Sequence, residues 1–258
     1  TLHALIQGGY RAEAKAWREW LVRAIAGDPK DMQIMYGVAG ERRLTEYELG
    51  WLPGYADSTP VRVGNAAADQ LQLDVYGEVM DSLEFSRAAG APPGGQVWSI
   101  QRNIMEYLEG NWQQPDNGIW EIRGERQHFT HSKVMAWVAV DRAISGVENW
   151  HLDGPDEKWR ALRDEIHADV LAHGYDADRG TFVQRYGSGD LDAALLLIPA
   201  VGFLPPGDLR VTGTIDAITR ELMTDGFVRR YQTTATASVD GIAGDDGAFL
   251  MCTFWLAD

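Results

Sequence analysis

Apolar residues recur along most of this chain at the three-to-four-residue spacing of an amphipathic helix, with little strand-like alternation to compete. The pattern predicts helices near residues 2–26, 65–89, 96–111, 131–147, 156–173, 190–199, 208–224 and 247–258. Asp208 stands where a helix N-terminus needs an acceptor, and Gly90, Gly174 and Gly226 stand where left-handed caps would end helices. We therefore expect an all-α fold.

The loops between these helices are rich in side chains that connectors seldom need. Ordering such side chains costs entropy, and in return they offer stacking faces and hydrogen bonds. The residues concerned are Trp51, Tyr55, Trp112, Trp120, Tyr186, Arg230 and Tyr231. We interpret these loops as one rim of a helical toroid, where the helices form the scaffold and the loops build a pocket.

The composition excludes several classes of partner. A chain of 258 residues that is 45% hydrophobic can bury a large core, so a single domain over 1–258 is expected. The net charge of −15 would repel nucleic acid, and no apolar run reaches the roughly 20 residues that span a bilayer. With Cys252 as the one cysteine, no intrachain disulfide can form, which fits the cytoplasm.

Both ends of the chain lack the signals that usually open and close helices. Helix-like sequence follows Thr1 at once without a cap, and the last apolar segment stops at Asp258 without Gly, Pro or a basic last turn. The chain is therefore expected to be a fragment of a longer protein.

The segment 113–137 carries the most chemical information, and it reads QQPDNGIWEIRGERQHFTHSKVMAW. Residues 115–118 have turn composition, and Trp120 and Glu121 follow directly. The apolar face of an indole disfavours the ionised form of a neighbouring carboxyl group, which can then donate a proton near neutral pH. Spacing alone leaves open that Glu121 simply pairs with Arg123 or Arg126.

This segment resembles the catalytic-acid motif of glycoside hydrolase family 15, which includes glucoamylases, glucodextranases and bacterial or archaeal trehalases. The resemblance covers nearly the whole chain in the family's order. Further segments that resemble bacterial members lie at residues 33–37, 40–44, 53–55, 60–65, 70–78, 240–242 and 247–250. The resemblance implies an (α/α)6 barrel of helical hairpins around a pocket for a terminal glucose, here incomplete at both ends.

The resemblance also implies roles for individual residues. Glu121 would be the proton donor of an inverting enzyme that cleaves α-glucosidic bonds. The implied substrate-binding residues are Trp120, Arg230, Tyr231, Tyr55, Arg62 and Asp246. Inversion also needs a second carboxylate, which the family carries in a segment expected beyond residue 258, so residues 1–258 alone are expected not to hydrolyse substrate.

No metal or cofactor is expected, because His128 and His131 lack the further ligands that zinc would need. The implied partner is a small carbohydrate, and the implied activity is exo-acting release of glucose from α-glucans, oligosaccharides or α,α-trehalose. Two alternatives stay open. One is a disaccharide phosphorylase, in which phosphate replaces the activated water, and the other is a catalytically silent fragment that only binds carbohydrate.

Overall fold

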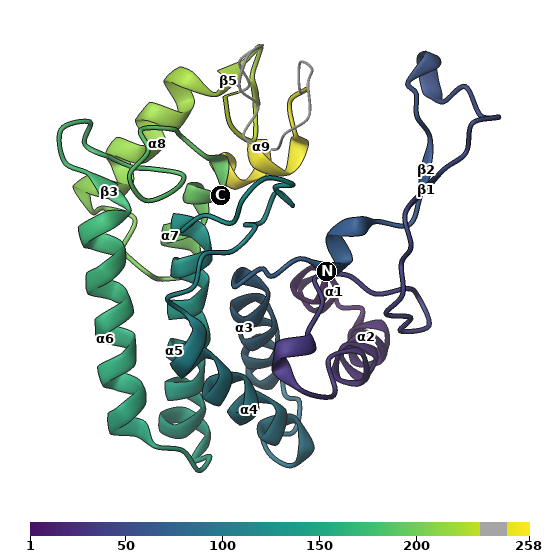
Figure 1. The fold of residues 1–258 in the computed structure, drawn as a ribbon. Coiled ribbons are helices and arrows are strands. Elements are labelled where there is room, and N and C mark those ends of the chain that lie inside the picture. The colour runs from purple at the N-terminus through teal and green to yellow at the C-terminus, as the bar shows by residue number, and fades with distance from the viewer. Residues whose placement is uncertain (233–246) are drawn as a thin grey trace. The chain divides into compact units, whose positions relative to one another are not determined.

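The computed structural model describes residues 1–232 and 247–258, and the chain divides into two compact units, Thr1–Leu71 and Gln72–Asp258. Helices make up most of the regular structure, and the strands of the described residues form only two-residue antiparallel pairs (Figure 1). The expected all-α class is confirmed, while the single domain stays a prediction. None of the helices in these residues has the length and apolar character that a membrane crossing needs.

The first unit opens with α1 (Leu2–Gln7) and α2 (Arg11–Ala24). The pattern predicts one helix over 2–26, but the helix breaks at Gly8 and Gly9, because a helix interior tolerates paired glycines poorly. The rest of the unit consists of three 3-10 turns and one strand pair. These are η1 (Pro29–Asp31), η2 (Tyr55–Asp57), η3 (Ala66–Asp69), β1 (Tyr47–Glu48) and β2 (Arg62–Val63).

The second unit holds the longer helices. They are α3 (Asp74–Ala88), α4 (Gln96–Asn111), α5 (Thr130–Trp150), α6 (Asp156–His173), η4 (Ala193–Leu196), α7 (Leu197–Ala200), α8 (Leu209–Glu221) and α9 (Leu250–Ala257). Two hairpins, β3 (Tyr175–Asp176) with β4 (Thr181–Phe182) and β5 (Met223–Thr224) with β6 (Phe227–Val228), complete it. The bounds of α4 and α6 are those predicted, whereas α3 starts nine residues later than predicted, because η3 occupies part of that range.

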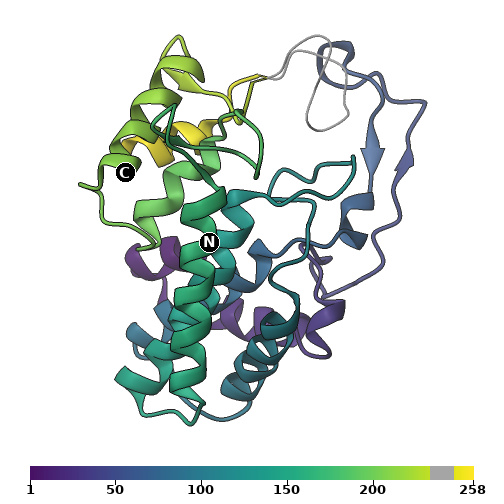
Figure 2. The same cartoon turned by 60° about the vertical axis from the view of Figure 1, so that its left-hand side comes forward.

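The core of this unit is α5, which packs against α3 and α6 (Figures 1 and 2). All residues from Ser132 to Val140 are buried, so this part of α5 has no solvent face. A helix buried on all sides is the centre of a helical layer. α3 approaches it closely at Gly77, where an added Cβ would lie 2.2 Å from the carbonyl oxygen of Met135. Any larger side chain there would push the two helices apart.

The structure agrees with two of the predicted helix ends and differs from the other two. Asp208 caps α8 by accepting a hydrogen bond from the main-chain N–H of Arg210, and Gly90 has a left-handed φ of 100° just after α3. Gly174 does end α6, but its φ of −91° is not left-handed. Gly226 lies in the β5–β6 turn rather than at a helix end.

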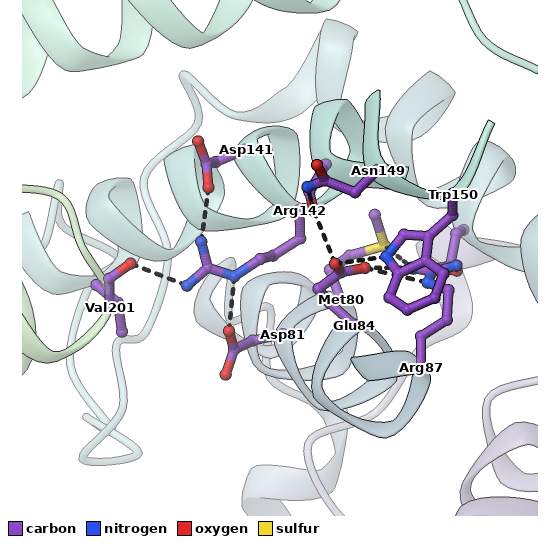
Figure 3. A network of polar contacts seen from close by, with 11 residues as sticks. Met80, Asp81, Glu84, Arg87, Asp141, Arg142, Asn149, Trp150 and Val201 are labelled. Carbon is purple, nitrogen blue, oxygen red and sulfur yellow. Dashed lines mark hydrogen bonds and ion pairs between the residues drawn. The ribbon is translucent and has the colours of Figure 1, made fainter. Parts of the chain in front are cut away.

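An arginine on α5 connects three parts of the second unit (Figure 3). Arg142 Nε donates to Asp81 Oδ1 on α3 at 2.7 Å, and Nη1 donates to the neighbouring Asp141 at 2.6 Å. Its third nitrogen donates to the carbonyl oxygen of Val201 at 2.9 Å, just after α7. Bidentate and forked contacts of this kind are what the planar guanidinium provides and an ammonium group does not.

Glu84 on α3 is the acceptor at the centre of a neighbouring network (Figure 3). Its carboxylate accepts from Arg87 at 2.8 Å, from Ser145 at 2.7 Å and from the Trp150 indole at 3.0 Å. Arg87 is 3% exposed, so its charge is paired inside the protein. Removing one partner of a buried pair costs far more than removing an exposed one.

We therefore expect Glu84→Gln to lower the free energy of unfolding by about 3 kcal/mol, because the Arg87 guanidinium stays buried without its counter-charge. Urea unfolding followed by circular dichroism measures the change. Glu106→Gln on the exposed side of α4 is the control and should be nearly neutral. Equal losses in the two variants would contradict the importance of the buried pair.

Candidate active site

The segment with the candidate acid forms a loop that is closed at its base. Asp116 and Gln127 make an antiparallel bridge with two main-chain hydrogen bonds of 2.9 Å. Inside the loop, the carbonyl oxygen of Asn117 accepts from the Ile122 N–H at 3.2 Å, and Asn117 Nδ2 donates to the Ile122 carbonyl oxygen at 3.0 Å. These bonds confine residues 118–121 to a tight tip.

Glu121 sits in this tip with a left-handed backbone, at a φ of 56°. Its N–H donates to the Gly118 carbonyl oxygen at 3.1 Å, and its side chain is half-buried. The tight turn thus spans 118–121 rather than the predicted 115–118, because Asp116 is held in the bridge. A left-handed residue other than glycine costs on the order of 1–3 kcal/mol, and such residues cluster at functional sites.

Two buried charged residues fix the chain that leads into the loop. Lys133, in the first turn of α5, is 1% exposed and donates to the carbonyl oxygens of Trp112 at 2.6 Å and Gln114 at 2.5 Å. Asp116 is 0% exposed and accepts from the Leu73 N–H at 2.8 Å. Burial lowers the pKa of Lys133 to about 8 and raises that of Asp116 to about 6.

Trp120 is the centre of an aromatic cluster beside Glu121. Its ring centroid lies 6.4 Å from Tyr231, 6.0 Å from Phe249 and 6.0 Å from Trp255. The guanidinium of Arg230 lies 5.5 Å from the Trp120 ring and 5.3 Å from the Tyr231 ring. The structure therefore brings together three residues that the resemblance groups, Trp120, Arg230 and Tyr231. Trp120 and Tyr231 are deeply packed, at 8% and 2% exposed.

Asp192 holds this cluster by hydrogen bonds. Its carboxylate accepts from Trp120 Nε1 at 2.8 and 3.0 Å, from Gln184 Nε2 at 3.0 Å and from the Ala194 N–H at 2.8 Å. Burial raises the pKa of Asp192 to about 6, while these donors and the charge of Arg230 act in the opposite direction.

The sequence reading misses the role of Asp192. Its local pattern, an Asp before an apolar run, indicates only the cap of a helical turn, and Asp192 does cap η4. No local pattern points to an indole 72 residues away. The sequence does not show that the Asp192 side chain is buried, and this burial is what indicates a role beyond capping.

Comparison with known proteins places the chain in a family. The sequence profile of the glycosyl hydrolases family 15 matches residues 1–258. The chain belongs to this family. It is 47% identical over 225 residues to a trehalase from Mycobacterium tuberculosis, covering 87% of the chain and 33% of the relative. It is 39% identical over 260 residues to a trehalase from Thermoplasma volcanium, covering 99% of the chain and 40% of the relative.

The chain thus spans about a third to two fifths of the length of these family 15 relatives. A glycosidase variant solved in complex with glucose is similar in fold, with a TM-score of 0.72 and 19% identity over 99% of the chain and 66% of that protein. A wild-type glycosidase matches with a TM-score of 0.71 and 20% identity, over the same shares. The structural neighbours are glycosidases of the six-hairpin fold, in agreement with the expected architecture.

The resemblance to family 15 implies three further site residues, two of them in the first unit and one outside the described residues. Tyr55, in η2 of the first unit, is 93% exposed. Arg62, in β2 of the same unit, pairs with Glu46 at 3.7 Å and Glu48 at 3.3 Å. Asp246 lies outside the described residues. The substrate contacts assigned to these residues stay predictions.

The two histidines that follow the loop do not share a site. His128 is exposed and stacks on Tyr186 with ring centroids 5.9 Å apart, whereas His131 is 4% exposed at the start of α5. Within the described ranges, no cluster of three or more His, Cys, Asp or Glu residues could hold a metal ion.

His131 should make the family 15 fold sensitive to acid. Both of its ring nitrogens are buried and make no hydrogen bond within the described residues, and burial lowers its pKa from 6.5 to about 4. The unfolded chain therefore takes up the proton first. The stability that the neutral ring contributes is complete above pH 6.5 and is lost as the pH falls toward 4.

We expect the free energy of unfolding to fall by about 3 kcal/mol more in the wild type than in His131→Phe between pH 7 and pH 4. Urea unfolding at a series of pH values gives both curves. His151→Asn, at an exposed left-handed position that Asn tolerates, is the control and should follow the wild type. Parallel curves for wild type and His131→Phe would refute the assignment.

Proposed function

We propose that the full-length protein containing this chain hydrolyses α-glucosidic bonds with inversion of configuration, and that Glu121 is its general acid. The observation that carries this proposal is the placement of Glu121 at the left-handed tip of a doubly closed loop, next in sequence to the Trp120 cluster. A general acid must be held at one position relative to the leaving oxygen. Aromatic faces and a guanidinium fork suit the apolar face and paired hydroxyls of a glucose ring.

In this mechanism the Glu121 carboxyl group gives its proton to the glycosidic oxygen as the bond from that oxygen to the anomeric carbon breaks. A water molecule attacks the anomeric carbon from the opposite face, and a second carboxylate accepts its proton. The two carboxyl groups of inverting enzymes stand about 6.5–9.5 Å apart. We propose that the second one belongs to a part of the full-length protein outside residues 1–258, since the matched relatives are longer than the chain.

Trehalose is the substrate we propose first. The support is that relatives 47% and 39% identical to this chain are named trehalases. Maltose, isomaltose and longer α-glucans, attacked from their ends, are the other candidates of the family. A neutral sugar is also compatible with the net charge of −15. The chain's one cysteine is compatible with a reducing compartment, and we propose the cytoplasm as its location.

Proton NMR of the first products tests both substrate and stereochemistry. With trehalose, inversion yields one α-glucose and one β-glucose per turnover, whereas retention yields two α-glucose molecules. With maltose or isomaltose, inversion releases β-glucose from the non-reducing end. Two α-glucose molecules from trehalose would rule out the inverting mechanism, and turnover that needs phosphate and forms glucose 1-phosphate would assign a phosphorylase instead.

We expect Glu121→Gln to lower kcat on trehalose by roughly 10²–10⁴-fold, the usual contribution of a general acid. The loss should be much smaller with α-glucosyl fluoride, because fluoride departs with little need of a proton. Glu125→Gln, an exposed residue of the same loop, is the control and should keep wild-type kinetics. Undiminished glucose release from trehalose by Glu121→Gln would exclude Glu121 as the acid.

A further inference from the structure

The Asp192 carboxylate accepts more hydrogen bonds than a helix cap requires. Capping η4 needs only the bond from the Ala194 N–H to Oδ1. The carboxylate also takes both contacts of the Trp120 indole N–H and the Gln184 amide, and Asp192 is 3% exposed. Placing an ionisable group in such a site is costly unless its hydrogen bonds do something that an apolar residue cannot do.

The main chain at Asp192 and Ala193 pairs with another segment of the site. Asp192 forms an isolated antiparallel bridge with Tyr231, and the neighbouring Ala193 N–H donates to the Arg230 carbonyl oxygen at 2.8 Å. One residue therefore connects the loop that carries Trp120 with the strand-like segment that carries Arg230 and Tyr231. These segments are distant in sequence. The Asp192 side chain holds the first, and the N–H of the neighbouring Ala193 binds the second.

The indole is the part of the cluster that needs a directional bond. Its contacts with Tyr231, Phe249 and Trp255 are ring contacts at 6.0–6.4 Å, which allow a ring to slide or tilt. The bonds from Nε1 to both Asp192 oxygens fix the direction in which the indole points. Glu121 is one peptide bond away, so a shift of the Trp120 main chain that follows the freed indole also moves Glu121.

We propose that Asp192 is a positioning residue of this active site, which holds the Trp120 indole and thereby the neighbouring Glu121 in the geometry needed for cleavage. This inference rests on the proposed function for its kinetic consequence. Asp192 itself contacts neither the bond being broken nor the water. A displacement of about 1 Å at a reacting group can cost 10²-fold in rate, so the effect of losing this anchor should be large.

Asparagine at position 192 can keep most of the hydrogen bonds of the Asp192 carboxylate, so Asp192→Asn is a conservative variant. In Asp192→Asn, the remaining oxygen can still accept from Trp120 and Ala194, and the new NH₂ group faces Gln184. Gln184 Oε1 is buried and accepts no hydrogen bond within the described residues, so turning the Gln184 amide satisfies that NH₂ group. Asp192→Ala, in contrast, leaves three donors without an acceptor.

The test compares Asp192→Ala, Asp192→Asn and the control Asp190→Asn, a half-buried carboxylate two residues away, in the full-length protein. We expect kcat/KM to fall about 100-fold in Asp192→Ala, less than about fivefold in Asp192→Asn and hardly at all in Asp190→Asn. The folded fraction is checked by circular dichroism at the assay temperature. Asp192→Ala within threefold of wild type, or equal losses in the Ala and Asn variants, would overturn the proposal.

A double-mutant cycle with Trp120→Phe separates positioning from loss of stability. Trp120→Phe keeps a ring but removes the indole N–H, so the losses of Trp120→Phe and Asp192→Ala should not multiply in the double variant. Multiplied losses would mean that Asp192 acts by another route and would overturn the proposal. Should Asp192→Ala not fold, Trp120→Phe carries the test, and wild-type kcat/KM in this variant would overturn the proposal as well.

The proposed function and this inference can fail separately. Wild-type protein that cleaves no α-glucoside would refute the function. In that case glucose binding, read by tryptophan fluorescence, serves as the probe, and Asp192→Ala should weaken it at least tenfold while Asp192→Asn restores it. Unchanged glucose affinity in Asp192→Ala would refute the positioning role.

Discussion

The burial of residues 130–140 of α5 on all sides is the constraint on which the second unit depends. Because α3 and α6 pack against this helix, the polar residues of its first turn are buried together with its apolar ones. Lys133 must then find acceptors inside the protein, and it finds them in the carbonyl oxygens of Trp112 and Gln114. The same burial that builds the core therefore anchors the chain that enters the Glu121 loop.

Four buried ionisable groups lie around this loop: Asp74, Asp116, Lys133 and Asp192. Burial raises the pKa of Asp74 well above its usual value, and the nearby charges of Asp116 and Glu78 add to the effect. Asp116 and Asp192 are raised to about 6, and Lys133 is lowered to about 8, all chiefly by burial. Such groups cost folding energy, and their concentration at one place is typical of functional sites.

Sequence reasoning works for this protein where the information is local. The periodic pattern predicts α4 and α6 to the residue. The same pattern misses the break at the paired glycines between α1 and α2, and it misses the 3-10 turn η3. The Trp120 and Glu121 pair is visible in sequence because both residues belong to one motif. The roles of Asp192 and Lys133 are not, because their partners come from distant segments and depend on the packing that brings them together.

The loop's own hydrogen bonds can stabilise its strained backbone, but they do not orient the Trp120 side chain. A left-handed Glu121 costs on the order of 1–3 kcal/mol, and each internal hydrogen bond contributes about 1 kcal/mol. The bridge between Asp116 and Gln127 and the two Asn117 bonds can offset that cost. These bonds act at Asp116, Asn117, Ile122 and Gln127, however, and none of them holds the Trp120 side chain. The buried carboxylate of Asp192 orients the Trp120 side chain. Because burying this carboxylate costs stability, we ascribe a functional role to it.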